Sequence, residues 1–268
     1  MLLRAAVVAV LAALSAWSCA AGADDTLDRA LALERRGDYA GAAAAYRPLA
    51  AAGDPVAQIQ LGGLLVAGRG VAEDPAEAAK YFAAAAERGN TEAQVSLAQL
   101  YMRGAGVPFD LRQAAAWYQR AADLGNTEAA AELAGMRLNG IGVAADPPAA
   151  LALYEKAAAS EDPEILMTLG IMYGQGIGTD INVDKAITWL RRSADQNYPR
   201  AQYNLGVIYG KGLGVPVDLV EAYKWFDLAS KQGDDDAQDA RDVISRDMSP
   251  DQVAQGRARS RSWMPRPN

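Results

Sequence analysis

Apolar residues recur along this chain at helical spacing. Over residues 93–101 they stand at i, i+4, i+7 and i+8, and over residues 114–121 at i, i+3, i+4 and i+7. Both spacings place the apolar side chains on one face of an α-helix. Gly104 and Gly106 lie between the two segments and break the first helix. The pattern therefore predicts two helices joined by a glycine turn.

The same pattern returns every 36 residues, and five consecutive units cover residues 57–236 without insertion or deletion. A period of this length is typical of a solenoid, in which a unit buries its apolar face only against a neighbour. Each unit is predicted to be an antiparallel helix pair. Aligned positions include Leu61, Leu97, Leu133, Leu169 and Leu205; Gly68, Gly104, Gly140, Gly176 and Gly212; and Gly70, Gly106, Gly142, Gly178 and Gly214.

Polar residues mark the start of the second helix in each unit. The predicted N-caps are Asp74, Asp110, Asp146, Asn182 and Asp218. Side chains of this type accept hydrogen bonds from the free N–H groups of a first helical turn. Glu77, Gln113 and Glu221 follow three residues later, which is the spacing of a capping box.

Both ends of the array depart from the repeat. Residues 24–56 match the second half of a unit and are expected to form a degenerate capping helix pair, and residues 237–255 are expected to form capping helices at the other end. Residues 256–268 are interpreted as a loosely ordered basic tail. This tail is expected to be solvated, and the alternatives are that it binds an anionic surface or the acidic body of the protein itself. Its basic residues are Arg257, Arg259, Arg261 and Arg266.

Residues 1–23 have the three parts of a secretory signal peptide. Arg4 precedes an uncharged run from Ala5 to Leu14, and small residues follow it. We expect cleavage, a periplasmic or secreted protein, and no integral membrane span in the mature chain. A retained membrane anchor is one alternative, and lipidation of Cys19, as in bacterial lipoproteins, is another.

Composition limits the chemistry. The chain has 268 residues, no His and one Cys, which excludes Ser-His-Asp and Cys-His catalysis and His-ligated metal sites. A net charge of −7 gives no reason to expect nucleic-acid binding. The Gly-x-Gly segments follow predicted helices and lack a trailing Gly-Lys, so they indicate helix stops and not phosphate loops. We therefore assign no catalytic residue, metal ligand or cofactor.

The repeat unit Ala-x3-Leu-Gly-x2-Tyr-x2-Gly-x-Gly-Val resembles the Sel1-like repeat, a relative of the tetratricopeptide repeat. The resemblance extends over residues 37–245, and residues 201–215 hold one of its clearest copies. The third unit departs most, with Arg137 in place of Tyr, Leu153 in place of Trp and Glu161 in place of Gly. A locally looser helix pair is expected there.

This resemblance implies a right-handed α/α solenoid, an all-α fold of antiparallel helix pairs with a 36-residue period, that binds other proteins through its curved faces. Exported bacterial members of the family look like adaptors in envelope assembly and signalling, and others confer immunity against secreted toxins. The cysteine-rich relatives that have been called β-lactamases carry paired cysteines, which this chain lacks.

A candidate binding surface is found by subtraction. Removing the positions that face the partner helix leaves a second stripe, at i, i+4 and i+7, on the first helix of each unit. This stripe is more apolar than a solvent-exposed face and predicts a groove with an apolar floor and a polar rim. Alternatively, the same side chains pack against neighbouring units and complete the core. The candidate partner-binding residues are Ile59, Val95, Gln99, Met102, Arg103, Leu138, Met167, Ile171, Tyr203, Val207 and Lys211.

The leading hypothesis is a monomeric, non-enzymatic scaffold or adaptor of the bacterial cell envelope that binds a protein or peptide. An immunity or inhibitor protein that holds a secreted toxin or enzyme is the first alternative. An enzyme that acts on cell-wall sugars through carboxylates is the second, because two acidic side chains from different units can meet in a folded array.

Overall fold

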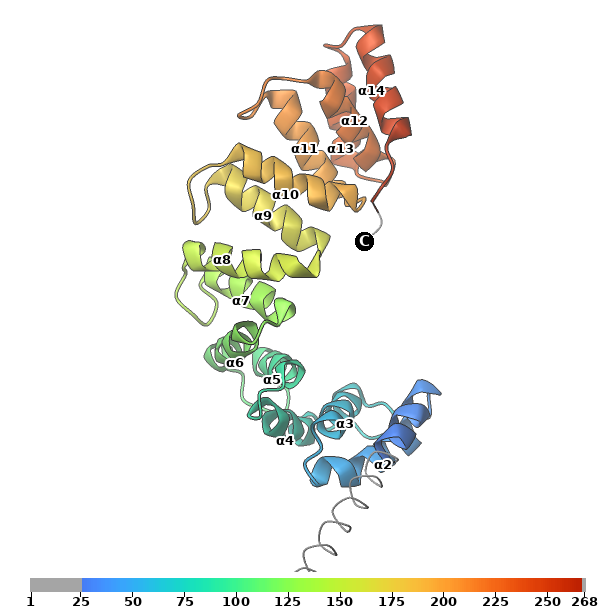
Figure 1. The fold of residues 1–268 in the computed structure, drawn as a ribbon, viewed down its shortest axis with the longest axis vertical. Coiled ribbons are helices and arrows are strands. Elements are labelled where there is room, and N and C mark those ends of the chain that lie inside the picture. Colours follow the sequence, from blue (N-terminus) through green and yellow to red (C-terminus); the bar gives the residue numbers. More distant parts are fainter. Residues whose placement is uncertain (1–25, 267–268) are drawn as a thin grey trace, which may run out of the picture. The chain divides into compact units, whose positions relative to one another are not determined.

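The structure, a computed structural model, describes residues 26–266, and the regular secondary structure in that range is helical (Figure 1). The expected signal peptide and Cys19 lie outside the described residues. Contacts between residues divide the chain into two units, of which the first ends at Leu124 and the second begins at Gly125. The all-α solenoid of antiparallel helix pairs expected from the sequence is confirmed.

The first unit is an up-and-down stack of helices, each packed against the next. A helix over residues 26–35 and α2 occupy the segment in which a capping pair was expected, and the Tyr46 hydroxyl of α2 donates a 2.6 Å hydrogen bond to Glu34 of that helix. The helices that follow are the first two complete pairs of the array. The bounds of α2 and of these four helices are α2 Tyr39–Ala51, α3 Pro55–Ala67, α4 Pro75–Ala86, α5 Thr91–Arg103 and α6 Leu111–Asp123.

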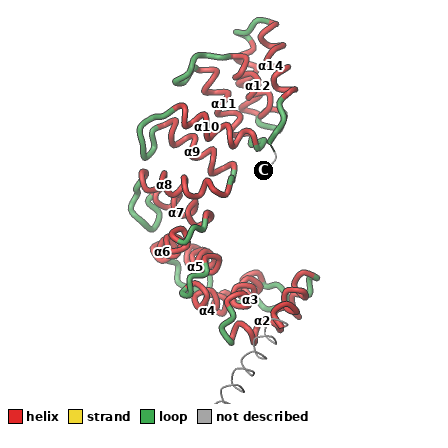
Figure 2. Tube along the Cα trace, viewed as in Figure 1, coloured by secondary structure: helices red, strands yellow, loops and turns green. Residues whose placement is uncertain are grey.

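The second unit continues the pattern with three helix pairs and a C-terminal cap. The turns that join α7 to α8, α9 to α10 and α11 to α12 lie along one edge of this unit (Figure 2). The bounds are α7 Thr127–Asn139, α8 Pro147–Ala157, the 3-10 turn η1 Ala158–Ser160, α9 Pro163–Gln175, α10 Val183–Asp195, α11 Pro199–Lys211, α12 Leu219–Ser230, α13 Asp235–Ser245 and α14 Pro250–Ser262.

All five predicted N-caps are confirmed, because each side chain accepts a hydrogen bond from a backbone N–H in the first turn of its helix. The capping boxes predicted at Glu77, Gln113 and Glu221 are wrong. A box needs the backbone N–H of the N-cap residue as a donor. That N–H is already used, since Asp74 donates to the carbonyl of Leu65, Asp110 to that of Tyr101 and Asp218 to that of Tyr209.

The two glycines of each turn have different roles, as Gly104 and Gly106 show. Gly104 ends α5 in the left-handed conformation, at φ 64°, and its N–H donates to the carbonyl of Leu100. Gly106 also has a positive φ, and a Cβ there would lie 2.2 Å from the carbonyl carbon of Pro75 at the start of α4. The second glycine thus allows a turn to touch the backbone of the preceding repeat.

Buried glutamines tie successive repeats together. Nε2 of Gln58, Gln94 and Gln202 donates to a carbonyl at the end of the preceding helix pair, at distances of 3.2, 3.0 and 3.3 Å. The acceptors are the carbonyls of Ala50, Ala86 and Ala194. The corresponding residue of α9 is Leu166, which cannot make this bond. Ala130 occupies the same position on α7 and cannot make the bond either, and at the junction of α8 and α9 the polar contact is a hydrogen bond that the Tyr173 hydroxyl donates to Glu155.

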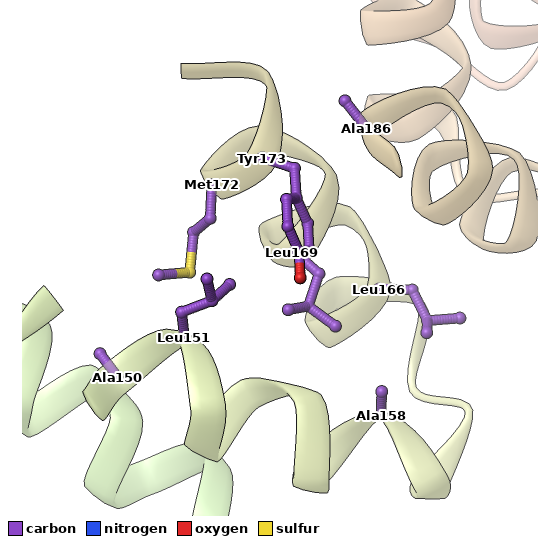
Figure 3. Close-up of a cluster of buried hydrophobic side chains, with 8 residues drawn as sticks. All are labelled: Ala150, Leu151, Ala158, Leu166, Leu169, Met172, Tyr173 and Ala186. Atoms are coloured by element: carbon purple, nitrogen blue, oxygen red, sulfur yellow. The ribbon is translucent and has the colours of Figure 1, made fainter. Parts of the chain in front are cut away.

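The third repeat is looser, but not where the sequence suggested. α7 and α8 pack together as extensively as the helix pairs of the first unit, whereas α8 contacts α9 less than α10 contacts α11. Figure 3 shows the apolar cluster at this junction, in which Leu151 of α8 and Met172 of α9 point toward each other. The expected looseness thus lies between two repeats and not within one helix pair.

The C-terminal helix covers α12 and is more ordered than a loose tail. The boundary expected before Gly256 falls inside α14, which continues to Ser262. Arg259 forms an ion pair with Glu221 at 3.0 Å, and the ring of Trp263 meets that of Trp225 at a centroid distance of 6.3 Å. α14 thus binds the acidic body of its own unit.

A buried carboxylate holds this cap in place. Asp227 pairs with Lys231 at 2.6 Å and with Arg241 at 3.2 Å, and it accepts a 2.7 Å hydrogen bond from Ser260 of α14. Burial by itself would raise the pKa of the Asp227 carboxyl, but these partners outweigh burial and lower the pKa below its usual value.

Replacing Gly106 with Ala should destabilise the first unit by about 3 kcal/mol or more, because the added Cβ meets backbone atoms as well as an unfavourable φ. The control is Gly89→Ala, at φ 86° with nothing within 4 Å of the added carbon, which should cost only about 1 kcal/mol. Urea unfolding followed by circular dichroism measures both. Equal losses would contradict the close approach.

Acid should release α14 before the rest of the second unit unfolds. Because folding lowers the pKa of Asp227, the stabilisation is present above its unfolded pKa of about 3.9 and is lost as the pH falls through the lower folded value. Asp227→Asn should cost about 2 to 3 kcal/mol at neutral pH and remove this acid dependence.

Hydrogen exchange over residues 250–262 as a function of pH measures this release. The control is Asp242→Asn, which removes an exposed carboxylate that also pairs with Arg241 and should change stability by less than about 1 kcal/mol. An unchanged acid dependence in Asp227→Asn would contradict the assignment.

Candidate functional site

Two helices of the second unit, α9 and α11, border a groove that contains part of the predicted stripe. A cavity of about 390 Å³ there is lined by Met167 and Ile171 of α9 and by Tyr203 and Asn204 of α11. Polar side chains form its rim, since Arg200 lies at the start of α11 and Asp234 and Asp236 lie at the start of α13. We call this cavity and its extension the α9–α11 groove.

The extension is a second cavity, of about 180 Å³, which shares Ile171 and Asn204 with the first. Its walls are mainly apolar and include Val207 and Leu213. Gly170 and Gly174 of α9 also line it, and Gly170 lets α10 approach closely, since a Cβ there would lie 2.6 Å from Cγ of Leu190. An aliphatic side chain of a partner is the chemistry that such a recess accepts.

The structure separates the predicted residues by depth. Ile59, Val95 and Met167 are only 7%, 5% and 8% exposed, so these side chains complete the core. Burial removes Ile59 and Val95 from the candidate surface, because a side chain without exposed area offers little contact to a partner. Met167 contributes only the floor of the α9–α11 groove.

Three other predicted residues are half-buried and line the groove as well as packing inward. Ile171 packs against the buried apolar cluster that includes Leu205. Tyr203 and Val207 pack against a second cluster, which includes Phe226. The rings of Tyr203 and Phe226 lie 5.6 Å apart. The two interpretations left open by the sequence therefore both apply at these positions.

The remaining predicted residues lie outside the α9–α11 groove. Gln99, Met102 and Leu138 are half-buried on α5 and α7, and Arg103 and Lys211 are exposed at the ends of their helices. Leu138 also packs against the core cluster at the junction of α8 and α9. None of these five residues lines the α9–α11 groove.

A second groove lies between α7 and α9, and the sequence analysis did not find it. A cavity of about 600 Å³ is bordered there by the first halves of both helices, by Tyr154 of α8 and by the turn after η1. We call it the α7–α9 groove. Its acidic residues are Glu128, Glu132, Glu161, Asp162 and Glu164, and Ala131, Gly135 and Ile165 contribute apolar surface.

Electrostatics in the α7–α9 groove are unfavourable for its own carboxylates. Burial raises the pKa of the Glu132 carboxyl, and the negative charge of Glu128 raises it further. The pKa of the Tyr154 hydroxyl is also raised, first by burial and then by Glu132 and Glu164. A carbon added at Gly135 would lie 3.6 Å from this hydroxyl. The groove thus concentrates negative charge.

The sequence did carry a signal for this groove. The third unit departs from the repeat at Glu161, which adopts a left-handed φ of 56° where Gly53, Gly89 and Gly125 stand in other repeats. That departure was interpreted as a loose helix pair. The carboxylate-lined cavity beside Glu161 could be recognised only in the folded structure.

Other chemistry is limited. Among residues 26–266, no three His, Cys, Asp or Glu side chains are placed to hold a metal ion. No helix of this range is long and apolar enough to cross a bilayer.

Stacked antiparallel helix pairs with open grooves between their first helices define an α-solenoid of the tetratricopeptide-like class. The Sel1 repeat matches five segments of the chain, residues 55–90, 91–126, 127–162, 167–198 and 199–234. The chain therefore belongs to the Sel1 repeat family. Residues 163–166 stay unmatched, and they lie at the junction of α8 and α9.

Solved structures with the same fold support this assignment. A protective antigen of uropathogenic Escherichia coli that displays an SLR fold has a TM-score of 0.80 and 29% identity, with 89% of this chain and 53% of that chain covered. The present chain thus spans about half the length of that antigen. A Sel1 repeat protein from Oxalobacter formigenes has a TM-score of 0.75 and 26% identity, with 85% and 96% covered.

A third solved structure is much less similar to this chain. An immunity protein from Pseudomonas aeruginosa has a TM-score of 0.43 and 20% identity over 78% of this chain and 81% of its own. A search of curated proteins found no significant match.

Proposed function

We propose that this protein is a non-enzymatic scaffold or adaptor of the bacterial cell envelope that binds a partner protein in the α9–α11 groove. Sel1 repeat proteins are generally protein-interaction scaffolds and are typically non-catalytic. The α9–α11 groove is the observation that carries the proposal for this chain, because it combines an apolar recess with a charged rim.

The groove suits one anchor side chain of a partner. The recess beside Ile171 and Val207 is apolar, so an aliphatic or aromatic side chain that enters it leaves water. Arg200 and Asp236 on the rim present charges of both signs, which fix the orientation of a bound segment more than its affinity. Fixed side chains around a small apolar recess favour a specific partner.

An envelope location is part of the proposal, and the amino-terminal segment supports it. Arg4, the apolar run that follows it and the small residues before Asp24 support export of the chain. An adaptor and an immunity protein share this location and differ in their partners. An adaptor contacts several components, whereas an immunity or inhibitor protein holds one toxin or enzyme in a fixed ratio.

A photo-crosslinking amino acid at Asn204 should capture the partner in cells that produce the protein naturally, because Asn204 lines both cavities of the groove. The same group at Thr188, an exposed position on α10, is the control and should give no adduct. Mass spectrometry of the adducts identifies the partner. Equal capture at both positions would refute binding in the α9–α11 groove, and a single stoichiometric partner would favour the inhibitor alternative.

Processing of the amino terminus tests the location. We expect the protein recovered from the envelope fraction to begin between Ala20 and Asp24, as an intact-mass measurement can show. A mass increased by lipid at Cys19 would establish the lipoprotein alternative. A chain that keeps Met1 and stays in the cytoplasm would contradict the envelope proposal.

A further inference from the structure

We propose that residues 263–266, which we call the C-terminal strap, occupy a docking site for a partner protein and are exchanged for a partner segment of the same chemistry. That chemistry is an aromatic side chain followed three residues later by a basic one, as in Trp263 and Arg266. The site goes beyond the proposed function. None of Asp195, Trp225 and Leu228, which form it, lines the α9–α11 groove.

The strap runs from the end of α14 to the end of α10 (Figure 1). The indole of Trp263 packs against the buried apolar cluster that includes Trp225 and Leu228, and it meets the Trp225 ring edge to face. The backbone N–H of Arg266 donates a 2.8 Å hydrogen bond to the carbonyl of Asp195. Nε of Arg266 also lies 3.3 Å from Oδ2 of Asp195. The site thus holds one aromatic ring and one cation.

The surroundings of Trp225 set the fifth repeat apart from two others. The same repeat position is also tryptophan in the second and fourth repeats, at Trp117 and Trp189. An arginine three residues later covers each of those two rings, with its guanidinium carbon 4.4 or 4.5 Å from the ring centroid. Leu228 stands at that position after Trp225, where Nζ of Lys224 lies 3.9 Å from the ring centroid. The fifth repeat thus lacks the arginine, and the ring of Trp263 packs beside this tryptophan.

Few contacts among the described residues hold the strap. The Arg266 side chain is 83% exposed, so water screens its ion pair with Asp195. Met264 is 78% exposed. Asp195 is the last residue of α10, and its carbonyl therefore has no partner within the helix and can accept a hydrogen bond from any peptide N–H. The indole of Trp263 is thus the main anchor, and a partner with such an anchor can replace it.

One buried donor stays unsatisfied beside the strap. Trp225 is 2% exposed, and its indole N–H has no hydrogen-bond acceptor among the described residues. A buried N–H without an acceptor destabilises the state that contains it. The ring of Trp263 brings no acceptor oxygen. A partner segment whose backbone carbonyl reaches this N–H would bind more favourably than the strap does.

The strap competes with a partner because it is tethered to the site. It follows α14 directly, and a short tether gives an effective concentration on the order of millimolar or higher. The apparent affinity of a free segment is reduced by the fraction of molecules in which the strap is open. A variant with an open strap should therefore bind such a segment more tightly than the natural protein.

Fluorescence anisotropy with a labelled peptide tests the proposal on the full chain. The peptide is Ser-Trp-Met-Pro-Arg, the sequence of residues 262–266, and a control peptide has alanine in place of tryptophan. The opened variant is Trp263→Ala with Arg266→Ala. The matched control is Met264→Ala, which changes an exposed side chain of the strap.

The peptide should bind the opened variant at least about tenfold more tightly than the natural protein, because no strap competes. Met264→Ala should bind it as the natural protein does. Arg266→Ala alone leaves the Trp263 indole in place and should give a smaller gain, which keeps the test valid if the opened variant unfolds. Adding Asp195→Asn to the opened variant should weaken binding about twofold to fivefold, since it removes an exposed carboxylate.

Three results would overturn the proposal. The opened variant and Arg266→Ala bind the peptide no better than the natural protein, or the alanine peptide binds as tightly as the tryptophan peptide, or the natural protein sediments as a dimer that the opened variant does not form. The third result would assign the site to the strap of a second copy. None of these results bears on the crosslink at Asn204, so the two proposals fail independently.

Discussion

Close contact between backbones in successive repeats is the constraint on which the rest of the fold depends. The second glycine of a turn lies so near the start of an earlier helix that no side chain fits, as at Gly106 over Pro75 and Gly178 over Pro147. Such contact leaves little freedom in the distance between the helix pairs that it joins. It agrees with turns of constant length and with the 36-residue spacing of the repeats.

The two grooves have different physical origins within this fixed frame. The α9–α11 groove follows from the regular pattern, since it lies between the first helices of two successive repeats and apolar residues such as Ile171 and Val207 line its recess. The α7–α9 groove lies where Glu132 and Glu161 depart from the residues of the other repeats. A regular array thus supplies a shared kind of recess, and a local departure supplies a surface with its own chemistry.

Local signals predicted local structure well, and packing depth poorly. The N-caps and glycine stops were predictable because each depends on a few neighbouring residues, as at Asp110 and Gly104. The capping box at Glu77 was not, since a carbonyl of another helix takes the N–H it needs. The stripe identified one helix face, but it could not show that Val95 is buried while Val207 is half-buried and lines a cavity. Helical spacing determines the direction of a side chain and not how deeply it is buried.

The α7–α9 groove was beyond prediction for a related reason. Glu132 and Tyr154 lie on different helices, and nothing in their spacing along the chain shows that they meet. The same holds at the C-terminus, where Ser260 reaches Asp227 across more than thirty residues of sequence. Long-range pairs of this kind depend on how repeats stack, which a single repeat does not specify.

Leu166 also has a consequence for how the array folds. In a linear array each repeat gains most of its stability from its neighbours, so cooperativity is transmitted through the junctions. The junction of α8 and α9 has no buried glutamine bond, and its helices contact each other less than α10 contacts α11. We therefore expect this junction to transmit less cooperativity. Opening of the helices before this point need not spread to those after it. Among the junctions between repeats of the second unit, the one between α8 and α9 is therefore expected to transmit cooperativity least.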